Sequence, residues 1–151
     1  MNIKRSEFII QFHFQKSILL KERRKLKDFI AQRLLHEGDK CGSEINFIFC
    51  SDDDLLEINR KHLNHDYYTD IITFDLSEKH SCNLVSDIYI SVDRVKDNAQ
   101  IESVLISKEL LRVIFHGLLH LIGYKDKSAK QEREMRAMEE KWMADFSQYR
   151  K

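Results

Sequence analysis

Two histidines and an aspartate near the carboxyl end of the chain have the spacing of metal ligands. His116 and His120 are four residues apart, and Asp126 follows. On a helix, residues four apart share one face with Cβ atoms roughly 5–6 Å apart, so both imidazoles can reach one ion. Gly123 suits the left-handed position at which helices end, which lets the chain turn back and bring Asp126 to that ion. Three protein ligands leave a position open, as in catalytic zinc sites.

The simplest alternative to a metal site is that the two histidines are buried core residues with hydrogen-bond partners in the protein. Apolar residues surround the pair at Leu118, Leu119, Leu121 and Ile122. An uncharged histidine on such a buried helix needs specific hydrogen-bond partners. Metal coordination supplies partners for both rings at once, and the helix stop and carboxylate fit the same reading. The pattern therefore favours a metal over two satisfied core histidines.

Two other kinds of metal site share part of this spacing. Extended zinc proteases carry H-E-x-x-H-x-x-G-x-x-H, in which the glutamate serves as general base. Gly117 occupies that position here and has no side chain to accept a proton, so a protease-like hydrolase is disfavoured. A two-histidine, one-carboxylate iron site is a second alternative. We expect one zinc ion per chain bound by His116, His120 and Asp126, with another first-row divalent metal as the alternative.

A divalent ion with an open position indicates metal-assisted hydrolysis. Such an ion lowers the pKa of its bound water from 15.7 towards about 7 and polarises a phosphoryl oxygen. With RNA as the substrate, activation of the neighbouring 2′-hydroxyl is a second route. The residues do not separate these two routes, and in both of them His116, His120 and Asp126 act through the metal.

Composition points to one neutral domain. The chain has 151 residues, 42% of them hydrophobic, which suits one core, so we expect a single domain over residues 1–151. Lys and Arg together number 25, as do Asp and Glu, so the net charge does not indicate nucleic-acid binding. A neutral net charge is still compatible with a local basic groove. No apolar run reaches the ~18–20 residues of a membrane span, and the first residues lack the features of a secretory leader.

The three cysteines suggest a reducing compartment. Cys41, Cys50 and Cys82 are odd in number and lack the close spacing of a thiolate metal site or a redox motif. We expect them to be reduced thiols of a cytoplasmic protein.

Strand and helix patterns alternate along the chain without a linker or repeat. Apolar alternation and β-rich runs predict strands at residues 8–14, 45–50, 70–76 and 87–92. Helices are predicted at 20–36, from Ser51 to about 61, from Ser91 or Asp93 to about 100, at 107–122 and at 130–149. This order predicts an α+β or α/β fold, a small mixed sheet covered by helices, with the metal site at the end of a buried helix.

The segment from His116 to Asp126 resembles the signature of the bacterial YbeY family, H-G-x-L-H-L-x-G-Y-D-H, at nine of eleven positions. Residues 58–74 are similar to the family segment L-N-R-x-Y-R-x-x-D-x-P-T-D-V-L-S-F, and residues 86–91 to G-D-I-x-I-S. The resemblance implies a single-domain, zinc-dependent endoribonuclease of ribosomal RNA maturation. Where the family has Asp-His, this chain has Lys125-Asp126, so the third ligand changes from imidazole to carboxylate.

One departure from the family concerns the substrate. The second arginine of the upstream segment, which the family is thought to direct at the substrate phosphate, falls on Leu63. Candidates for substrate contacts are Arg60, which matches the family, and the nearby cations Lys61, His62, His65 and Lys125, each of which would otherwise be a solvated surface residue.

The resemblance therefore implies a cytoplasmic, single-strand-specific endoribonuclease. It would act in small-subunit ribosomal RNA maturation and ribosome quality control, with ribosomal RNA and the ribosome or its proteins as partners, without a membrane, and as a monomer. The alternative is a ribosome-associated, metal-stabilised RNA-binding assembly factor with little nuclease activity, because Leu63 removes a cleft cation. Cleavage of RNA by metal-loaded protein, beside a His116→Ala variant, separates the two.

Overall fold

The computed structural model describes residues 7–65 and 67–150, and within them the chain forms four strands and five helices. The strands lie in the spatial order β1 (Phe8–Phe14), β2 (Gly42–Cys50), β4 (Asn83–Ser91) and β3 (Ile71–Asp75). β1, β2 and β4 run parallel, whereas β3 pairs antiparallel with β4 at the edge. The mixed sheet confirms the predicted α+β class.

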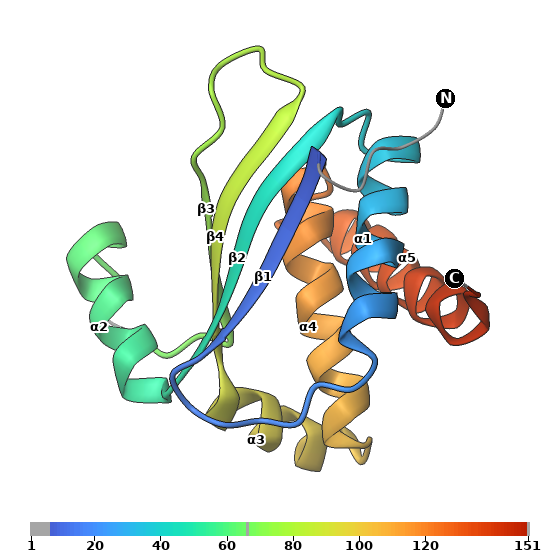
Figure 1. Ribbon diagram of the computed structural model, residues 1–151. Helices are drawn as coiled ribbons and strands as arrows, with labels where there is room; N and C mark the ends of the chain where they lie inside the picture. Colours follow the sequence, from blue (N-terminus) through green and yellow to red (C-terminus); the bar gives the residue numbers. More distant parts are fainter. Residues whose placement is uncertain (1–6, 66, 151) are drawn as a thin grey trace.

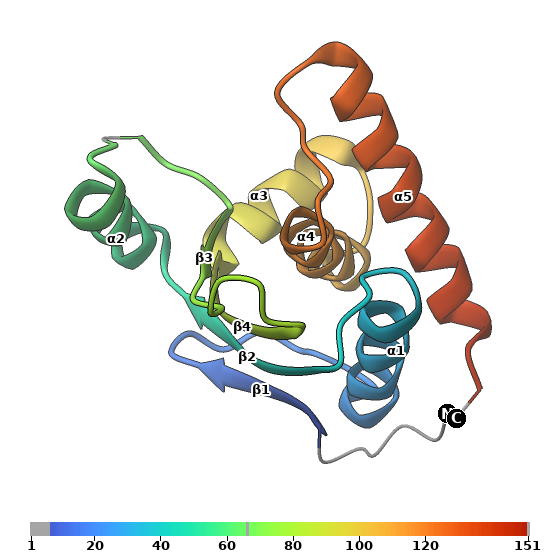
Figure 2. The same ribbon diagram turned by 90° about the horizontal axis from the view of Figure 1, so that it is seen from above.

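The helices cover the sheet unequally. They are α1 (Arg23–His36), α2 (Asp52–Leu63), α3 (Val92–Glu102), α4 (Ile106–Leu121) and α5 (Ala129–Gln148). α1, α4 and α5 lie together on one side of the sheet, and α2 lies on the other side, where it packs against β3 and β4 (Figures 1 and 2). Side-chain alternation along β3 explains this, because Ile71 and Thr73 face α4 while Ile72 packs in a cluster with Leu55 of α2.

Aromatic side chains join the three helices on the covered face. The Phe29 ring of α1 lies 5.5 Å from the ring of Phe115 of α4 and 5.3 Å from that of Phe146 of α5, measured between centroids. Trp142 of α5 lies 5.6 Å from Phe115 and is fully buried. Tilted and edge-on aromatic pairs contribute about 0.5–1.5 kcal/mol each beyond their buried area. This cluster fixes α4, the predicted metal helix, between the sheet and α5.

Serine caps begin three of the helices. Ser51 Oγ accepts a hydrogen bond from the Asp54 N–H at the start of α2, as the sequence predicts. Ser91 caps α3 in the same way, and Ser128 forms a capping box with Gln131 at the start of α5. The acidic first turn of α2 is structural, because Asp52 accepts hydrogen bonds from Arg94 Nε at 3.1 Å and Ser91 Oγ at 3.2 Å.

β4 begins at Asn83, four residues before its predicted start at residue 87. The sequence prediction missed these residues because two of them are polar. The buried Ser86 is satisfied inside the sheet, since its Oγ donates a hydrogen bond to the Phe74 carbonyl at 2.7 Å. The extra residues pair with the start of β2, with Gly42 opposite Asn83.

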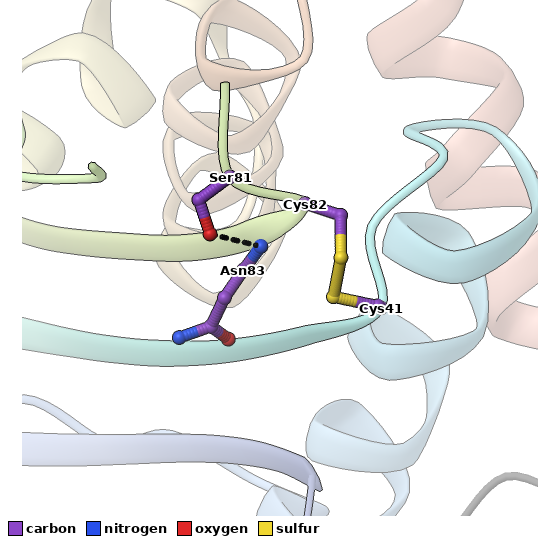
Figure 3. The surroundings of a disulfide bond; sticks show 4 residues. All are labelled: Cys41, Ser81, Cys82 and Asn83. Atoms are coloured by element: carbon purple, nitrogen blue, oxygen red, sulfur yellow. Dashed lines mark hydrogen bonds between the residues drawn. A yellow bond between two sulfur atoms is a disulfide. The ribbon is translucent and has the colours of Figure 1, made fainter. Parts of the chain in front are cut away.

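The prediction of three reduced cysteines is wrong for Cys41 and Cys82, which form a disulfide (Figure 3). Their Cα atoms lie 5.3 Å apart, within the usual range for a bridge. The Cys41 N–H also donates to the Cys82 carbonyl at 3.1 Å. The two residues directly precede paired strands, so strand pairing brings together cysteines that are 41 positions apart.

Cys50 is the free cysteine of the described residues and is buried at the end of β2. Burial, with a contribution from the nearby carboxylates of Asp54, Asp93 and Asp52, raises the pKa of its thiol to about 12. The thiol therefore stays protonated at neutral pH and behaves as a small core side chain.

None of the helices in residues 7–65 and 67–150 combines the length and the apolar composition that crossing a bilayer would require.

Candidate metal centre

α4 carries both histidines on the edge of its buried face. Leu110, Val113, Ile114, Phe115 and Leu118 pack into the core. His116 and His120 stand beside this stripe and are partly exposed, with ring centroids 4.6 Å apart and planes at 85°. One helix therefore fixes both rings from a rigid, packed support, as their four-residue spacing predicts.

The turn after α4 brings the aspartate back to the histidines. Gly123 has a φ of 115°, a conformation that residues with a side chain rarely adopt, and its N–H donates to the His120 carbonyl at 3.1 Å. Asp126 Oδ2 then lies 3.4 Å from His116 Nε2 and 3.3 Å from His120 Nε2. The predicted role of the glycine is confirmed, because the chain reverses at this residue.

The three side chains form a group that fits one metal ion. One ligand atom from each of His116, His120 and Asp126 can be chosen so that all three lie within 4.8 Å of one another. Two imidazole nitrogens and a carboxylate oxygen are a donor set that zinc and other first-row divalent ions accept. The Asp126 side chain is 40% exposed and that of His120 30%, so one side of the group faces solvent. An accessible fourth position is the arrangement of a catalytic ion.

Behind His116 lies a buried network of charged groups that the sequence analysis missed. Glu139 of α5 has a 3% exposed side chain, and its Oε2 lies 2.6 Å from His116 Nδ1. Arg112 Nη1 donates to Glu139 Oε1 at 3.1 Å, and Arg112 also donates two hydrogen bonds of 2.7 Å to Glu109. Burial alone would raise the pKa of Glu139, but the His116 hydrogen bond and Arg112 outweigh it and hold the pKa below its usual range.

A signal for Glu139 was present in the sequence. Met135, Glu139, Trp142 and Phe146 recur at helical spacing, so the carboxylate stands within an apolar stripe that the structure buries. A lone acid in such a stripe needs a buried partner. The partner, His116, lies 23 residues away in sequence, so local periodicity alone could not name it.

Asp70 connects the network to the start of β3. Its Oδ2 lies 3.7 Å from Arg112 Nη2 and accepts a hydrogen bond from Asn98 Nδ2 at 3.4 Å. Burial raises the pKa of Asp70, although Arg112 and His116 act in the opposite direction. The segment that leads from α2 to β3 is thereby held against α4 near the histidines.

Gly117 faces the sheet and not the metal group. A Cβ at this position would lie 2.7 Å from Ile71 Cδ1 and 3.3 Å from Thr73 Cγ2. A side chain at the position where a zinc protease carries its glutamate base would thus have to displace Ile71 and would point at the sheet, away from the metal group. The structure agrees with the sequence argument against a protease mechanism.

The substrate candidates fall into two groups. Lys125 belongs to the same α4–α5 connection as Asp126 and is exposed. Arg60, Lys61 and His62 form the basic last turn of α2, and His65 follows it. The contacts found for this second group lead elsewhere, with Lys61 paired to Glu57 at 2.9 Å and the His65 ring stacked on Tyr67 at 5.1 Å between centroids. In Figure 2 the α2–β3 connection and the α4–α5 connection extend to the same side of the molecule, beyond the β3 edge.

An open cleft adjoins the metal group between α4 and α5. It measures about 640 Å³, and its lining includes Arg112, His116, Asp126, Arg133 and Arg136. Leu63 is 40% exposed at the end of α2 and stands where the family that the sequence resembles has its second arginine. The accessible cations near the triad of His116, His120 and Asp126 are therefore on the α4–α5 connection and on α5.

Comparison with known proteins gives a consistent result. The family model described as Endoribonuclease YbeY matches residues 10–147. Proteins named Endoribonuclease YbeY from Flavobacterium psychrophilum and Porphyromonas gingivalis are 42% identical over 138 residues and 48% identical over 119 residues. These alignments cover 91% and 79% of this chain and 96% and 77% of those proteins. The protein of that name from Cytophaga hutchinsonii is 59% identical over 97 residues, or 64% of this chain and 67% of that protein.

A solved structure supports the fold. The solution structure of a Thermotoga maritima protein superposes with a TM-score of 0.62 at 28% sequence identity, covering 92% of this chain and 88% of that one. The family model spans most of the chain, including the histidine pair and Asp126. On this ground the chain belongs to the family described as Endoribonuclease YbeY.

Proposed function

We propose that this protein is a metal-dependent endoribonuclease that hydrolyses single-stranded RNA, with residues 1–151 as one catalytic domain. The observation that carries the proposal is the convergence of His116, His120 and Asp126 around an accessible side of a partly buried group. Zinc is the proposed ion, at one per chain, and another first-row divalent metal is the alternative. Membership of a family named for endoribonuclease activity supports RNA as the substrate.

The residues of the chain divide the work between holding the ion and holding the substrate. His116, His120 and Asp126 would bind the ion, which when bound supplies Lewis-acid chemistry by acidifying water and polarising a phosphoryl oxygen. α4 holds both imidazoles in place before the substrate arrives, so little reorganisation remains for the reaction itself. Gly117 has no side chain to act as a base, so the helix supplies no glutamate of the protease type to accept the proton of the attacking water.

The substrate path proposed for the RNA crosses the β3 edge. Lys125 beside the ligands and the basic end of α2, with Arg60, Lys61, His62 and His65, would contact phosphates along this path. Cations in such positions fix the register of a strand without reading its bases.

Resemblance to the YbeY family alone supports the biological setting, because the Cys41–Cys82 disulfide removes the support that reduced cysteines would give to a cytoplasmic location. We propose that the protein acts in the cytoplasm as a monomer, on ribosomal RNA of the small subunit during maturation and quality control, in contact with the ribosome or ribosomal proteins.

A second candidate is an RNA-binding ribosome assembly factor with little nuclease activity. The observation in its favour is Leu63, an exposed apolar residue at the position of the family's second arginine. The two candidates differ in RNA turnover, which the next experiment measures.

Removal and restoration of the metal are expected to switch RNA cleavage off and on. A single-stranded RNA with a fluorophore and quencher should be cleaved by zinc-loaded protein, lose cleavage after dialysis against a chelator, and regain it on addition of one equivalent of zinc. The physical reason is that a bound ion acidifies water and polarises the phosphoryl oxygen, and His116, His120 and Asp126 are the group of the described residues that could hold it.

Two controls keep this result interpretable. A duplex of the same sequence tests strand preference, and a peptide library tests the protease alternative. Turnover that persists at the same rate without metal would indicate a contaminating ribonuclease and support the assembly-factor candidate.

The double variant Lys61→Ala/Lys125→Ala is expected to flatten the salt dependence of RNA binding. Each phosphate contact to a single strand contributes about 0.7 to the slope of log affinity against log salt, so losing two contacts should reduce the slope by about 1.4. Fluorescence anisotropy measures this slope between roughly 50 and 300 mM salt. Metal-free protein is used so that the RNA is not cleaved during the titration.

The matched control is Lys21→Ala/Lys108→Ala. Both lysines are exposed, and Lys108 lies in the first turn of α4, at the opposite end of the helix from His120. Equal slopes in the two double variants would remove Lys61 and Lys125 from the proposed RNA path.

A further inference from the structure

One imidazole of the metal group is held from behind by a buried carboxylate. His116 presents Nε2 to Asp126, and its other nitrogen, Nδ1, lies 2.6 Å from Glu139 Oε2. His120 sits one turn further along α4, and its contacts with the residues that the structure describes include no carboxylate behind its ring. The two histidines of the group are therefore supported differently.

We propose that Glu139 is a positioning residue that sets which nitrogen of His116 binds the metal. A neutral imidazole carries one N–H, and the nitrogen without it holds the lone pair that binds metal. With the Glu139 carboxylate accepting from Nδ1–H, the proton stays on Nδ1 and the Nε2 lone pair faces Asp126 and the ion. This inference rests on the metal site of the proposed function and adds to it a residue outside the three ligands.

Glu139 is itself held in one orientation. Its second oxygen, Oε1, accepts a hydrogen bond from Arg112 Nη1 at 3.1 Å and lies 3.5 Å from Arg136 Nη1. Arg112 is in turn fixed by its two 2.7 Å hydrogen bonds to Glu109. Both carboxylate oxygens of Glu139 are thus occupied, so Oε2 has a single fixed direction in which to accept the hydrogen bond from His116 Nδ1–H. Carboxylates placed in this way behind a ligating histidine raise its basicity and fix its ring.

A purely structural role for Glu139 makes a different prediction. On that reading the carboxylate only neutralises Arg112 and joins α5 to α4. Glu109 offers a matched comparison, because it is equally buried, with a 3% exposed side chain, and makes the shorter bonds to the same arginine. Within the described part of the chain, the side-chain contacts of Glu109 are with Arg112 and include neither histidine of the group.

The experiment compares Glu139→Gln with Glu109→Gln in the full-length protein. Zinc affinity is measured by competition with a chromophoric chelator, and thermal unfolding is measured on the same metal-free samples. Both variants are expected to lose stability, because each removes a charge partner of Arg112. Only Glu139→Gln is expected to weaken zinc binding, by about 10–100-fold. Glu139→Asp, which keeps the charge, is expected to recover part of that loss.

Three outcomes would overturn the proposal. Zinc binding by Glu139→Gln at wild-type affinity would show that the carboxylate does not position the ligand. An equal loss of affinity in Glu139→Gln and Glu109→Gln would assign the effect to the Arg112 network as a whole. Absence of zinc binding by the wild-type protein would instead overturn the proposed metal site, and this inference with it.

A measurement on the wild-type protein covers the case in which Glu139→Gln does not fold. Nitrogen chemical shifts of ¹⁵N-labelled histidines report which ring nitrogen carries the proton. In the zinc-loaded protein, His116 is expected to carry its proton on Nδ1 and to bind zinc through Nε2. Metal bound through Nδ1 of His116 would contradict the assignment of Glu139.

Discussion

Alanine at His120 is expected to remove stable zinc binding and to lower RNA cleavage by more than about 100-fold. Loss of a residue that only supports a metal ligand costs up to about 100-fold, and His120 is itself a proposed ligand. The variant leaves two of three protein ligands, and no described His, Cys, Asp or Glu side chain lies close enough to replace the lost imidazole. His120 is a cleaner choice than His116, because His116 also contacts Glu139. Elemental analysis and RNA turnover measure the two losses in one preparation.

The control for this prediction is His36→Ala, which removes an exposed imidazole at the end of α1. Replacing the third ligand gives a graded test, since Asp126→Ala should weaken zinc binding whereas Asp126→His should keep it by restoring a donor of the family type. Zinc retained at one equivalent in His120→Ala would show that the ion binds elsewhere.

Loss of the Cys41–Cys82 disulfide is expected to lower the free energy of unfolding by about 4 kcal/mol. The bridge closes a loop between cysteines 41 positions apart and so reduces the conformational entropy of the unfolded chain. The chain-entropy model converts this loss of entropy into about 4 kcal/mol of stability for a loop of that length. Urea unfolding of Cys41→Ser/Cys82→Ser beside the oxidised wild type measures the difference.

Reductant provides the matching comparison. Reduced wild type should unfold at the same urea concentration as the double serine variant, and that variant should not respond to reductant. Cys50 remains in both proteins, and its burial keeps it out of the comparison. An oxidised wild type no more stable than the double variant would contradict the prediction.

Sequence reasoning succeeded where the relevant residues are close together in the chain. The His116, His120 and Asp126 group depends on one helix and one turn, so spacing and a glycine were enough to predict it. The start of α2 was predicted for the same reason, because a serine cap and an acidic first turn act on the residues beside them.

The missed features depend on how distant elements pack. Glu139 reaches His116 only because α5 packs along α4, and the aromatic contacts that decide this packing come from α1, α4 and α5 together. Cys41 and Cys82 meet because β2 and β4 pair from their first residues, and a strand register is set by the whole sheet. Counting cysteines and spacings could not reveal either contact.

The position of the metal group at the carboxyl end of α4 implies an order of binding. Aligned peptide dipoles place partial negative charge at this end of a helix, and Asp126 adds a full negative charge to the same place. Without a cation, these two negative contributions disfavour a phosphate at the ligand atoms themselves, whereas Lys125, Arg133 and Arg136 around them still attract the RNA backbone. A bound ion reverses the sign of the charge at the ligand atoms, so the order in which the ion binds before the scissile phosphate reaches them is the favoured one.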